Sequence, residues 1–474
     1  MTAIAAGHAL TAGAGHEVLR AGGSAVDACI AACFMAFVAE PVLAQPLGGG
    51  FLMAAPAGRA PRLLDGFVRT PRLRAEGDIR SIEADFGTST QVFHIGAGTI
   101  AVPGLVPMLF EAHERLGRIP MAELAAPAVR AAREGVAVSE MQASIARIVT
   151  PILAATAETA ALHLDDGAAA KHHRNPALAD ALEVLAIEGS RLFTEGEVAQ
   201  ALCDLPGAVL TPLDLRRHTP RWRDPLEAER AGTRLHLTPV PSITGAALAL
   251  ALDALPRRPD ALTIAAALQA LENAATLPES ARAEALSTAL ARHAVRQTGT
   301  TQISAIDREG NGAALTVSNG AGAGLVLPGT GIMPNNMLGE EDLLPDGPES
   351  WPLDTRLGSA MCPLALHDAE GGVTLLGSGG SSRIRSALLQ VLLQLTDGAR
   401  LEEAIAAPRL HVEKGRLAFE PMEEARDALL ASWPEATEWP APSPYFGGVH
   451  AVRRTRRGAF EAAADARRDG AALM

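Results

Sequence analysis

Two adjacent threonines, Thr300 and Thr301, follow Gly299 and open an alternating run deep inside the chain. A threonine hydroxyl is a weak nucleophile at neutral pH and needs a base to accept its proton. A free α-amino group has a pKa of about 7.7–8.0, so part of it is neutral near pH 7 and can act as that base. Threonine is also common in strands. Thr300 is therefore either an ordinary strand residue or a nucleophile that becomes an N-terminus.

The usual partners of a hydroxyl nucleophile are not recognisable in the sequence. It contains no G-x-S-x-G turn, and no histidine stands in the surroundings of a catalytic triad. The stretch GSGGSSRIRSALLQ (377–390) is a glycine-serine turn before a helix. Its backbone N–H groups could stabilise an oxyanion, and the helix dipole would assist. Most turns of this type only begin a helix, so this one alone does not establish a site.

Hydrophobic patterns and glycines predict the elements that would position these residues. Alternation over 300–307 and 313–318, with the turn REGNG between, predicts a β-hairpin. Residues 372–395 predict a strand, a turn and a helix, and 446–465 a closing pair of strands. Near the N-terminus, a helix ends at Gly22 and Gly23, and Ser24 is a suitable N-cap for the next. The pattern LGGGFLM (47–53) predicts a strand, and alanine-rich helices are expected over 246–294.

Two polar stretches have simple structural interpretations. Thr194 and Glu197 have the spacing of a helix capping box. His172 and His173 stand in the polar sequence HLDDGAAAKHHRNP, which is typical of a surface loop, and we do not expect them to bind a metal. We expect no metal or organic cofactor anywhere in the chain.

Composition excludes several classes of protein. The formal net charge of -13 argues against a nucleic-acid-binding surface, and RNA-binding and zinc-finger patterns are missing. The four cysteines include no CxxC or Cys/His zinc spacing. The most apolar segment, 25–38, is too short to cross a bilayer, and no basic region followed by an apolar stretch begins the sequence. We therefore predict a protein with no nucleic-acid or membrane partner. Its expected location is the cytoplasm, or the periplasm if the start of the sequence is mis-assigned.

Motifs along nearly the whole chain, in order, resemble the γ-glutamyltransferase family of N-terminal-nucleophile hydrolases. The matching stretches are GGSAVDACIAACFMAFVAEP (22–41), LGGGFLM (47–53), APAVRAAREGVAVS (126–139), LTPLDL (210–215), TTQISAIDREGNGAALTVS (300–318), PGTGIMPNNML (328–338), GSGGSSRI (377–384) and AADARRDGAA (463–472). Each motif is modest alone, but their collinear order is specific.

The resemblance implies an α+β fold, a four-layer αββα sandwich with additional helices, built as a single domain over 1–474. It implies self-cleavage between Gly299 and Thr300, leaving a large chain (1–299) and a small chain (300–474) that stay associated. Thr300 would then attack a small-molecule amide or peptide, such as a glutathione-like γ-glutamyl amide. The acyl-enzyme would be resolved by water or by an acceptor amine.

The resemblance also assigns roles to individual residues. Gly380 and Ser381 match an oxyanion-hole pair that is usually two glycines in the family. Ser318 matches a hydroxyl residue beside the nucleophile. Asn319 and Glu340 match substrate-binding positions, the acidic one for the substrate's α-amino group. Ser359 matches the first of two serines that hold the α-carboxylate, and the second position is Ala360.

One position departs from the family pattern. In LLDGFVRTP, Phe67 stands where the family has an arginine that clamps the α-carboxylate of the glutamyl group. Arg69 lies two residues on, so in an extended strand it would face the same way. It could replace the clamp, or it could form an ordinary surface ion pair.

Three functions therefore stay open. The first is a γ-glutamyl hydrolase or transferase with a relocated clamp. The second is an amidase or acylase whose pocket is lined by Phe67 and accepts a non-glutamyl acyl group. The third, of another class, is an uncleaved, non-catalytic binding protein.

Overall fold

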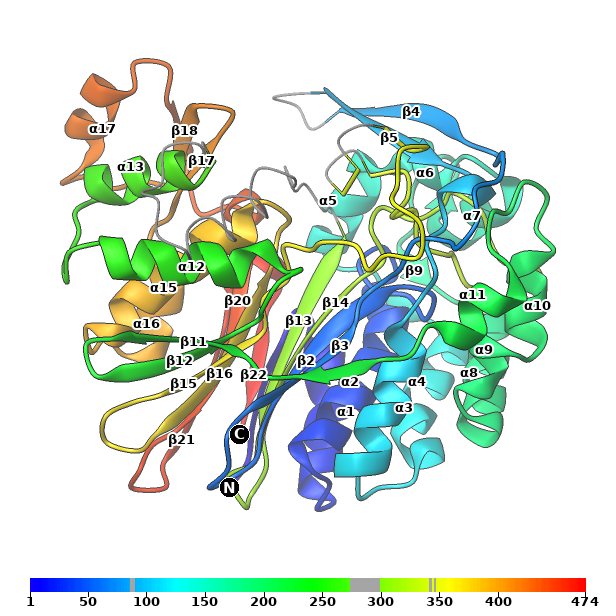
Figure 1. The fold of residues 1–474 in the computed structure, drawn as a ribbon, viewed down its shortest axis with the longest axis horizontal. Helices are drawn as coiled ribbons and strands as arrows, with labels where there is room; N and C mark the ends of the chain where they lie inside the picture. Colours follow the sequence, from blue (N-terminus) through cyan, green and yellow to red (C-terminus); the bar gives the residue numbers. More distant parts are fainter. Residues whose placement is uncertain (86–89, 273–298, 341–342, 345–346) are drawn as a thin grey trace.

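The chain folds around two antiparallel sheets that stack face to face, with helices on the outer face of each (Figure 1). The computed structural model describes residues 1–85, 90–272, 299–340, 343–344 and 347–474 of the 474-residue chain. This is the four-layer αββα architecture predicted from the sequence, with additional helices around it. Within the described ranges, no helix is both long and apolar enough to span a lipid bilayer.

The first sheet has seven strands in the order β10–β3–β2–β14–β13–β1–β22. Its strands are β10 (Arg221–Arg223), β3 (Arg62–Gly66), β2 (Gly49–Ala55), β14 (Gly312–Ser318), β13 (Thr300–Ile306), β1 (Ala3–Ala6) and β22 (Ala471–Leu473). The predicted hairpin is β13–β14, in which Thr300 lies opposite Ser318. On the other edge of β14, Ser318 lies opposite Gly49 of β2. The register therefore brings three separate segments together at the start of β13.

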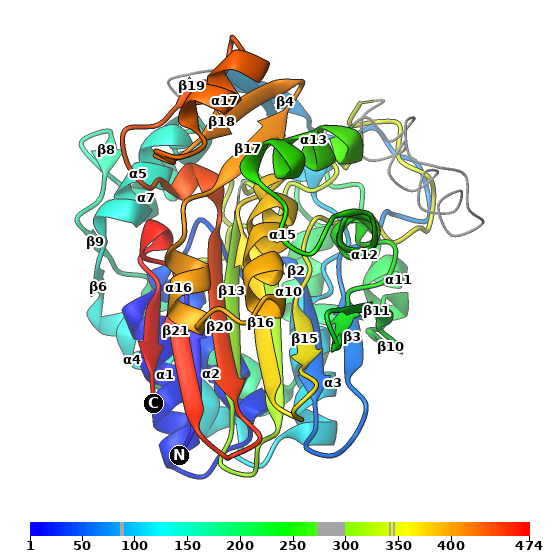
Figure 2. The ribbon, with the colours of Figure 1, turned by 90° about the vertical axis from the view of Figure 1, so that its left-hand side faces the viewer.

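The second sheet has six strands in the order β11–β12–β15–β16–β20–β21. Its strands are β11 (Leu226–Arg230), β12 (Thr233–Leu237), β15 (Leu364–His367), β16 (Val373–Gly379), β20 (Gly448–Arg454) and β21 (Phe460–Ala464). The predicted strand–turn–helix is β16 followed by α15 (Arg383–Thr396). Figure 2 shows the helical layer of α15 and α16 in front of this sheet.

Helices cover both sheets because each sheet has an apolar outer face. The first sheet is covered by a layer that contains α1 (Ala9–Arg20), α2 (Ala25–Ala39), α3 (Leu105–Leu116) and α4 (Met121–Glu134), with α8 (Pro176–Glu188) packed on α4. The second is covered by α15, α12 (Ile243–Ala254) and α16 (Leu401–Ala406), and α13 (Ala261–Glu272) lies above α12. As predicted, Ser24 caps α2, with a capping box completed by Asp27. Every residue of α2 is buried, which explains its uninterrupted apolar sequence.

Smaller elements surround this core. They are β4 (Arg80–Asp85), β5 (Thr90–Ile95), β6 (Val136–Ala137), β7 (Leu164–Asp165), β8 (Ala168–Ala169), β9 (His172–His173), β17 (Leu410–Glu413), β18 (Arg416–Phe419), β19 (Thr437–Glu438), α5 (Glu140–Ile148), α6 (Thr150–Leu153), α7 (Ala157–His163), α9 (Arg191–Thr194), α10 (Glu197–Cys203), α11 (Pro212–Arg217), α17 (Arg426–Ser432), and the 3₁₀ turns η1 (Ala97–Thr99), η3 (Pro444–Phe446) and η4 (Ala466–Arg468). The alanine-rich pattern expected up to residue 294 is α12 and α13, and 273–298 lie outside the described residues.

The capping box predicted at Thr194 is wrong. Thr194 ends α9, and its hydroxyl donates to the carbonyl of Ser190 at 3.4 Å. The next helix, α10, begins after Gly196 and has no side-chain cap. Thr194 and Glu197 have the spacing of a capping box, but Gly196 is the N-cap of α10, so Thr194 does not cap that helix.

Alternation along β13 sends neighbouring side chains into different layers. Ile303 and Ala305 pack in the apolar cluster of α1 and α2, whereas Ser304 donates to the carbonyl of His450 in the second sheet. Thr300 and Gln302 have the same parity as Ser304, so they face the space between the two sheets. The candidate nucleophile is thus an inter-sheet residue.

Candidate active site

Thr300 is the first residue of β13, and its side chain is almost fully buried. The residue is 1 % exposed, and its hydroxyl Oγ1 has no hydrogen-bond partner among the described residues. The chain is continuous across the bond from Gly299, so the nitrogen of Thr300 is an ordinary amide here. A buried hydroxyl without a partner is costly in a folded protein and is typical of a position held for chemistry.

Ser318 lies across the hairpin and contacts the bond that precedes Thr300. Its Oγ donates to the carbonyl oxygen of Gly299 at 2.5 Å and accepts from the amide of Gly320 at 3.1 Å. A Cβ atom at Gly299 would lie 2.0 Å from the Gly320 oxygen and 2.8 Å from the Val42 oxygen. Only glycine therefore fits before Thr300, and the hydroxyl of Ser318 polarises the carbonyl of that peptide bond.

The turn between β16 and α15 approaches Thr300 from the second sheet. A Cβ atom at Gly379 would lie 2.4 Å from the carbonyl oxygen of Thr300, so the two backbones are in direct contact. Gly380 has φ +124°, and Ser381 adopts φ +60°, which is unusual for a residue with a side chain. Such strain is common where a backbone is held for function. The predicted oxyanion pair, Gly380 and Ser381, thus directly follows a glycine that contacts Thr300.

Glu340 and Asn319 lie beside the loop that follows Ser318. A Cβ atom at Gly320 would lie 2.4 Å from Oε1 of Glu340. Glu340 is 5 % exposed, and burial raises its pKa to about 8, although the amide of Ala321 acts in the opposite direction. Asn319 donates to the carbonyl of Met333 at 3.1 Å, and its Oδ1 has no partner among the described residues. Both predicted substrate-binding residues therefore carry unsatisfied oxygens near the site.

Phe67 forms an apolar wall on the β2 side of the site. It is fully buried, and its ring stacks on Phe51 with centroids 5.6 Å apart. A Cβ atom at Gly49, the residue opposite Ser318, would lie 3.0 Å from the Phe67 ring. The position that holds an arginine in the family is thus close to the site and entirely hydrocarbon here.

Arg69 is engaged away from that wall. Its Nε donates to Oδ1 of Asp354 at 2.9 Å, and its backbone pairs with Val102. The Arg69 side chain is 21 % exposed and that of Asp354 is 50 % exposed, so this is an ion pair near the surface. The structure therefore has the ordinary ion pair rather than a guanidinium directed at Thr300.

Ser359 is buried, but its contacts are with its own neighbourhood. Its Oγ accepts from the amide of Met361 at 3.1 Å, and its backbone bonds to Pro241 and Ile243. Ala360 packs in the apolar core between the sheets. Ser359 is thus held in place by the local backbone, and the described contacts do not join it to Thr300.

Sequence reasoning missed a polar row that continues from Thr300 between the sheets. Gln302 is fully buried, hydrogen-bonds to the hydroxyl of Thr316, and donates to Ser304 Oγ at 3.0 Å. A Cβ atom at Gly377 would lie 2.2 Å from Gln302 Oε1, so the row contacts β16. Polar residues at every second position of β13 were the available signal.

Thr301 faces the opposite layer. A Cβ atom at Gly7 would lie 2.6 Å from Thr301 Oγ1 and 2.8 Å from Glu40 Oε2. Glu40 accepts from the hydroxyl of Thr11 at 2.7 Å, and burial raises the pKa of its carboxyl. The side chain of Thr301 thus points away from the space between the sheets that Thr300 faces. Thr301 is therefore not a second candidate nucleophile at the same site.

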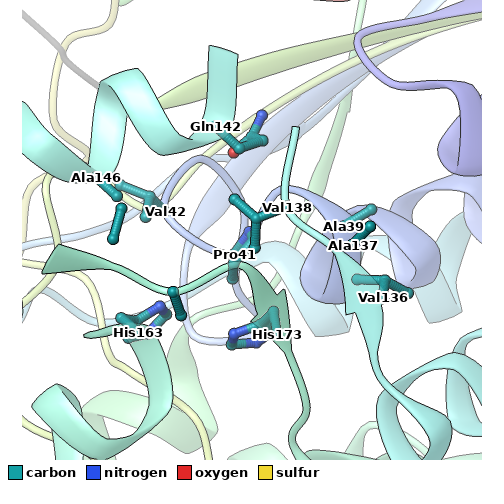
Figure 3. Close-up of a pocket in the computed structure, with 12 residues that line it drawn as sticks. Ala39, Pro41, Val42, Val136, Ala137, Val138, Gln142, Ala146, His163 and His173 are labelled. Carbon is teal, nitrogen blue, oxygen red and sulfur yellow. The ribbon is translucent and has the colours of Figure 1, made fainter. Parts of the chain in front are cut away.

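A small cavity of about 20 Å³ lies near Gly299 (Figure 3). Val42, whose carbonyl faces Gly299, is one of its walls, and His163 and His173 form another. The surface location expected for His173 is wrong, because it is buried and stacks on His163 with centroids 5.1 Å apart. Of the two adjacent histidines, only His172 is exposed. The described residues contain no group of three or more side chains able to hold a metal ion.

The fold of the chain matches that of a solved structure over its whole length. A solved structure, the cephalosporin acylase from Bacillus halodurans, aligns with 100% of this chain and 95% of its own, with a TM-score of 0.82 and 22% sequence identity. At that identity the likeness establishes the fold.

The sequence establishes the family. The profile described as Gamma-glutamyltranspeptidase matches residues 11–286 and 262–474, and the chain belongs to that family of hydrolases and acyltransferases. Similar proteins include "Acylase ACY 1 proenzyme" of Pseudomonas sp. (strain V22), 27% identical over 98% of this chain and 92% of that protein. They also include "Glutathione hydrolase proenzyme" of Pseudomonas aeruginosa, 28% identical over 86% of this chain and 82% of that protein. The relatives thus carry two kinds of activity in their names.

Proposed function

We propose that this protein is a self-processing amidohydrolase or acyltransferase whose nucleophile is Thr300. The observation that carries the proposal is the hydrogen bond from Ser318 to Gly299, beside the unpartnered hydroxyl of Thr300. Cleavage of the Gly299–Thr300 bond would leave chains 1–299 and 300–474 and a free amine on Thr300. The "proenzyme" names of two relatives support such processing.

The catalytic cycle uses only groups of this chain. The Thr300 amine accepts the hydroxyl proton while Oγ1 attacks the substrate carbonyl, and the amides of Gly380 and Ser381 stabilise the oxyanion. The ammonium then protonates the departing amine, which leaves an ester on Thr300. Water or an acceptor amine attacks this ester and regenerates the hydroxyl.

For the acyl group, the geometry favours an amidase or acylase. Phe67 and Phe51 place hydrocarbon where a carboxylate clamp would stand, and Arg69 is paired with Asp354. A carboxylate buried against such a wall without a charged partner would be costly. An acyl group with a neutral or apolar end fits better, and the acylase named among the relatives is consistent with it.

A γ-glutamyl amide of the glutathione type is the second candidate. Glu340 favours it, because a buried, unpaired carboxyl beside the loop after Ser318 could bind a substrate amine. A panel of four 4-nitroanilides separates the two candidates: γ-glutamyl (amine and carboxylate), glutaryl (carboxylate only), 4-aminobutyryl (amine only) and butyryl (neither). We expect the two without a carboxylate to be preferred.

The nucleophile is tested by the intact mass of the purified protein under denaturing conditions, with sequencing of any new N-terminus. Two chains, one beginning at Thr300, are expected from the wild type, and a single inactive chain from Thr300→Ala. A wild-type chain that stays intact would contradict the enzyme mechanism and favour a non-catalytic binding protein.

The single-domain organisation and the cytoplasmic location also stay predictions. Limited proteolysis would test the first, and cell fractionation would test the second.

A further inference from the structure

Glu40, at the end of helix α2, is a fully buried carboxyl that the proposed catalytic cycle does not use. It is 0 % exposed, and its backbone N–H donates to the carbonyl of Ala36 in the last turn of the helix. Its Oε1 accepts from the hydroxyl of Thr11 at 2.7 Å. Its Oε2 has no fully formed hydrogen bond among the described residues. A buried carboxyl oxygen without a complete partner is costly, so its position needs an explanation.

The second oxygen of Glu40 faces Thr301, the residue that follows the candidate nucleophile. A Cβ atom at Gly7 would lie 2.8 Å from Glu40 Oε2 and 2.6 Å from Thr301 Oγ1, so both atoms border the same small space. Burial raises the pKa of the Glu40 carboxyl, and the Thr301 hydroxyl opposes that rise as a hydrogen-bond donor. Because Gly7 has no side chain, the carboxyl and the hydroxyl can approach each other.

The loop that follows α2, residues 40–45, also contacts the residue before Thr300. A Cβ atom at Gly299 would lie 2.8 Å from the carbonyl oxygen of Val42 in this loop. One short loop therefore contacts the chain on both sides of the bond whose cleavage is proposed.

This loop is held in place by its own hydrogen bonds. The amides of Leu43 and Ala44 both donate to the carbonyl of Glu40, at 2.8 and 3.1 Å. The side chain of Gln45 donates to the carbonyl of Pro41 at 3.0 Å. Every residue of the loop is buried, and α2 packs on β13. The two contacts with the start of β13 therefore cannot relax without moving close-packed structure.

Self-cleavage depends on the backbone geometry at the start of β13. Oγ1 of Thr300 would attack the carbonyl carbon of Gly299, and the hydroxyl proton would pass to the Thr300 nitrogen as the C–N bond breaks. Water would then hydrolyse the resulting ester, which releases the Gly299 carboxylate and the Thr300 hydroxyl. The attacking oxygen and the carbonyl carbon belong to adjacent residues, so small displacements of either residue change the rate of attack.

We infer that Glu40 is a positioning residue for self-cleavage. Through Thr301 it holds the start of β13 against the helix layer, while Val42 contacts Gly299. The inference rests on the proposed function and adds to the cleavage step a residue on the opposite face of β13 from the Thr300 side chain. After the cut, Gly299 is no longer bonded to Thr300, so the mature enzyme does not need both contacts together.

The rate of self-cleavage tests this role. Glu40→Leu is similar in size but removes both oxygens, and it should slow the disappearance of the intact chain about 10- to 100-fold. Glu40→Gln keeps an oxygen for Thr11 and a polar group for Thr301, so its rate should stay within about threefold of the wild type. Thr301→Val should be slowed by a similar factor to Glu40→Leu, and the double variant no further, because both residues act through one contact. Additive losses would overturn the inference.

A matched control separates positioning from stability. Phe37→Leu lowers stability within the same buried helix but removes no polar group, so its cleavage rate should stay within about threefold of the wild type. Melting temperatures of uncut chains that also carry Thr300→Ala measure the stability lost in each variant. Equal slowing in Phe37→Leu and Glu40→Leu, at an equal loss of melting temperature, would overturn the inference.

Turnover after complete cleavage supplies a second readout. Glu40→Leu that has been left to cleave to completion should have kcat and KM values within about twofold of the wild type. A loss of kcat as large as the loss of cleavage rate would overturn the inference, because it would indicate general damage to the site. A wild-type chain that stays intact would refute the proposed function, whereas wild-type cleavage together with an unimpaired Glu40→Leu would refute the inference alone.

Discussion

Ser318 Oγ lies 2.5 Å from the carbonyl oxygen of Gly299, the oxygen of the bond whose cleavage would expose Thr300. This contact joins residues 19 positions apart and exists only because Thr300 pairs with Ser318 in the hairpin. One hydroxyl can therefore serve twice. It polarises the Gly299 carbonyl in the continuous chain and, after the proposed cleavage, would lie beside the new amine.

Ser318→Ala should slow self-cleavage about 10²- to 10³-fold, because loss of one donor to a developing oxyanion has effects of that size. The rate is measured as the disappearance of the intact chain by mass spectrometry. Ser318→Thr keeps a hydroxyl and should cleave faster than the alanine variant. Ser304→Ala serves as the control. It removes a hydroxyl from the face of β13 that carries Thr300, four residues further along the strand. Cleavage of Ser318→Ala at the wild-type rate would contradict this role.

Phe67→Arg should restore a carboxylate clamp. The ratio of kcat/KM for the γ-glutamyl over the 4-aminobutyryl anilide should rise tenfold or more, since charge-assisted hydrogen bonds contribute about 1.5–3 kcal/mol. A circular dichroism spectrum would verify that the variant folds. An unchanged ratio in a folded variant would show that Phe67 does not contact the acyl group.

Arg69→Ala should leave that same ratio unchanged, because its guanidinium is held by Asp354. The measurement is again the pair of kcat/KM values. A selective loss of the γ-glutamyl substrate would show that Arg69 swings to the site and replaces the missing clamp.

The pH dependence of amine-bearing substrates should report Glu340. Burial raises its pKa to about 8, so the carboxyl is largely neutral below that pH and ionised above it. The ratio of kcat/KM for the 4-aminobutyryl over the butyryl anilide should therefore rise as the pH passes upward through about 8. Taking the ratio removes the titration of the Thr300 amine, which both substrates share. In Glu340→Gln the ratio should be low and flat, and a retained rise would assign the titration to another group.

Acid should destabilise the fold through His163 and His173. Burial is the main cause that lowers their pKa values, to about 3 and about 4, below the ordinary 6.5. Their contribution to stability is therefore full above pH 6.5 and is lost as the pH falls below it. Each histidine should lower the free energy of unfolding by about 1.4 kcal/mol per pH unit in that window.

Urea unfolding of the uncut Thr300→Ala chain at pH 7 and pH 5 measures the loss of stability. His173→Gln should reduce the difference between the two pH values, whereas His172→Gln, at an exposed neighbour, should not. Identical differences in all three proteins would show that other groups control acid unfolding.

Local patterns were enough to predict the hairpin, the strand–turn–helix and the capped α2, because alternation, glycines and caps act within a few residues. The family motifs added the candidate nucleophile and the candidate oxyanion turn, which stay predictions. His173 was misjudged because a polar loop composition says nothing about the imidazole of His163 stacked on it.

The last strand, β22, pairs with the first, β1, with Leu473 opposite Ile4, so the two ends of the chain lie side by side (Figure 1). Thr300, in contrast, starts a strand in the middle of the sequence. A circular permutant could therefore join residue 474 to residue 1 through a short linker and begin at Thr300. Once the initiator methionine was removed, such a chain would carry the free α-amino group proposed as the base of Thr300 from the moment of synthesis. In such a permutant, the proposed self-cleavage would no longer be needed to produce that amine.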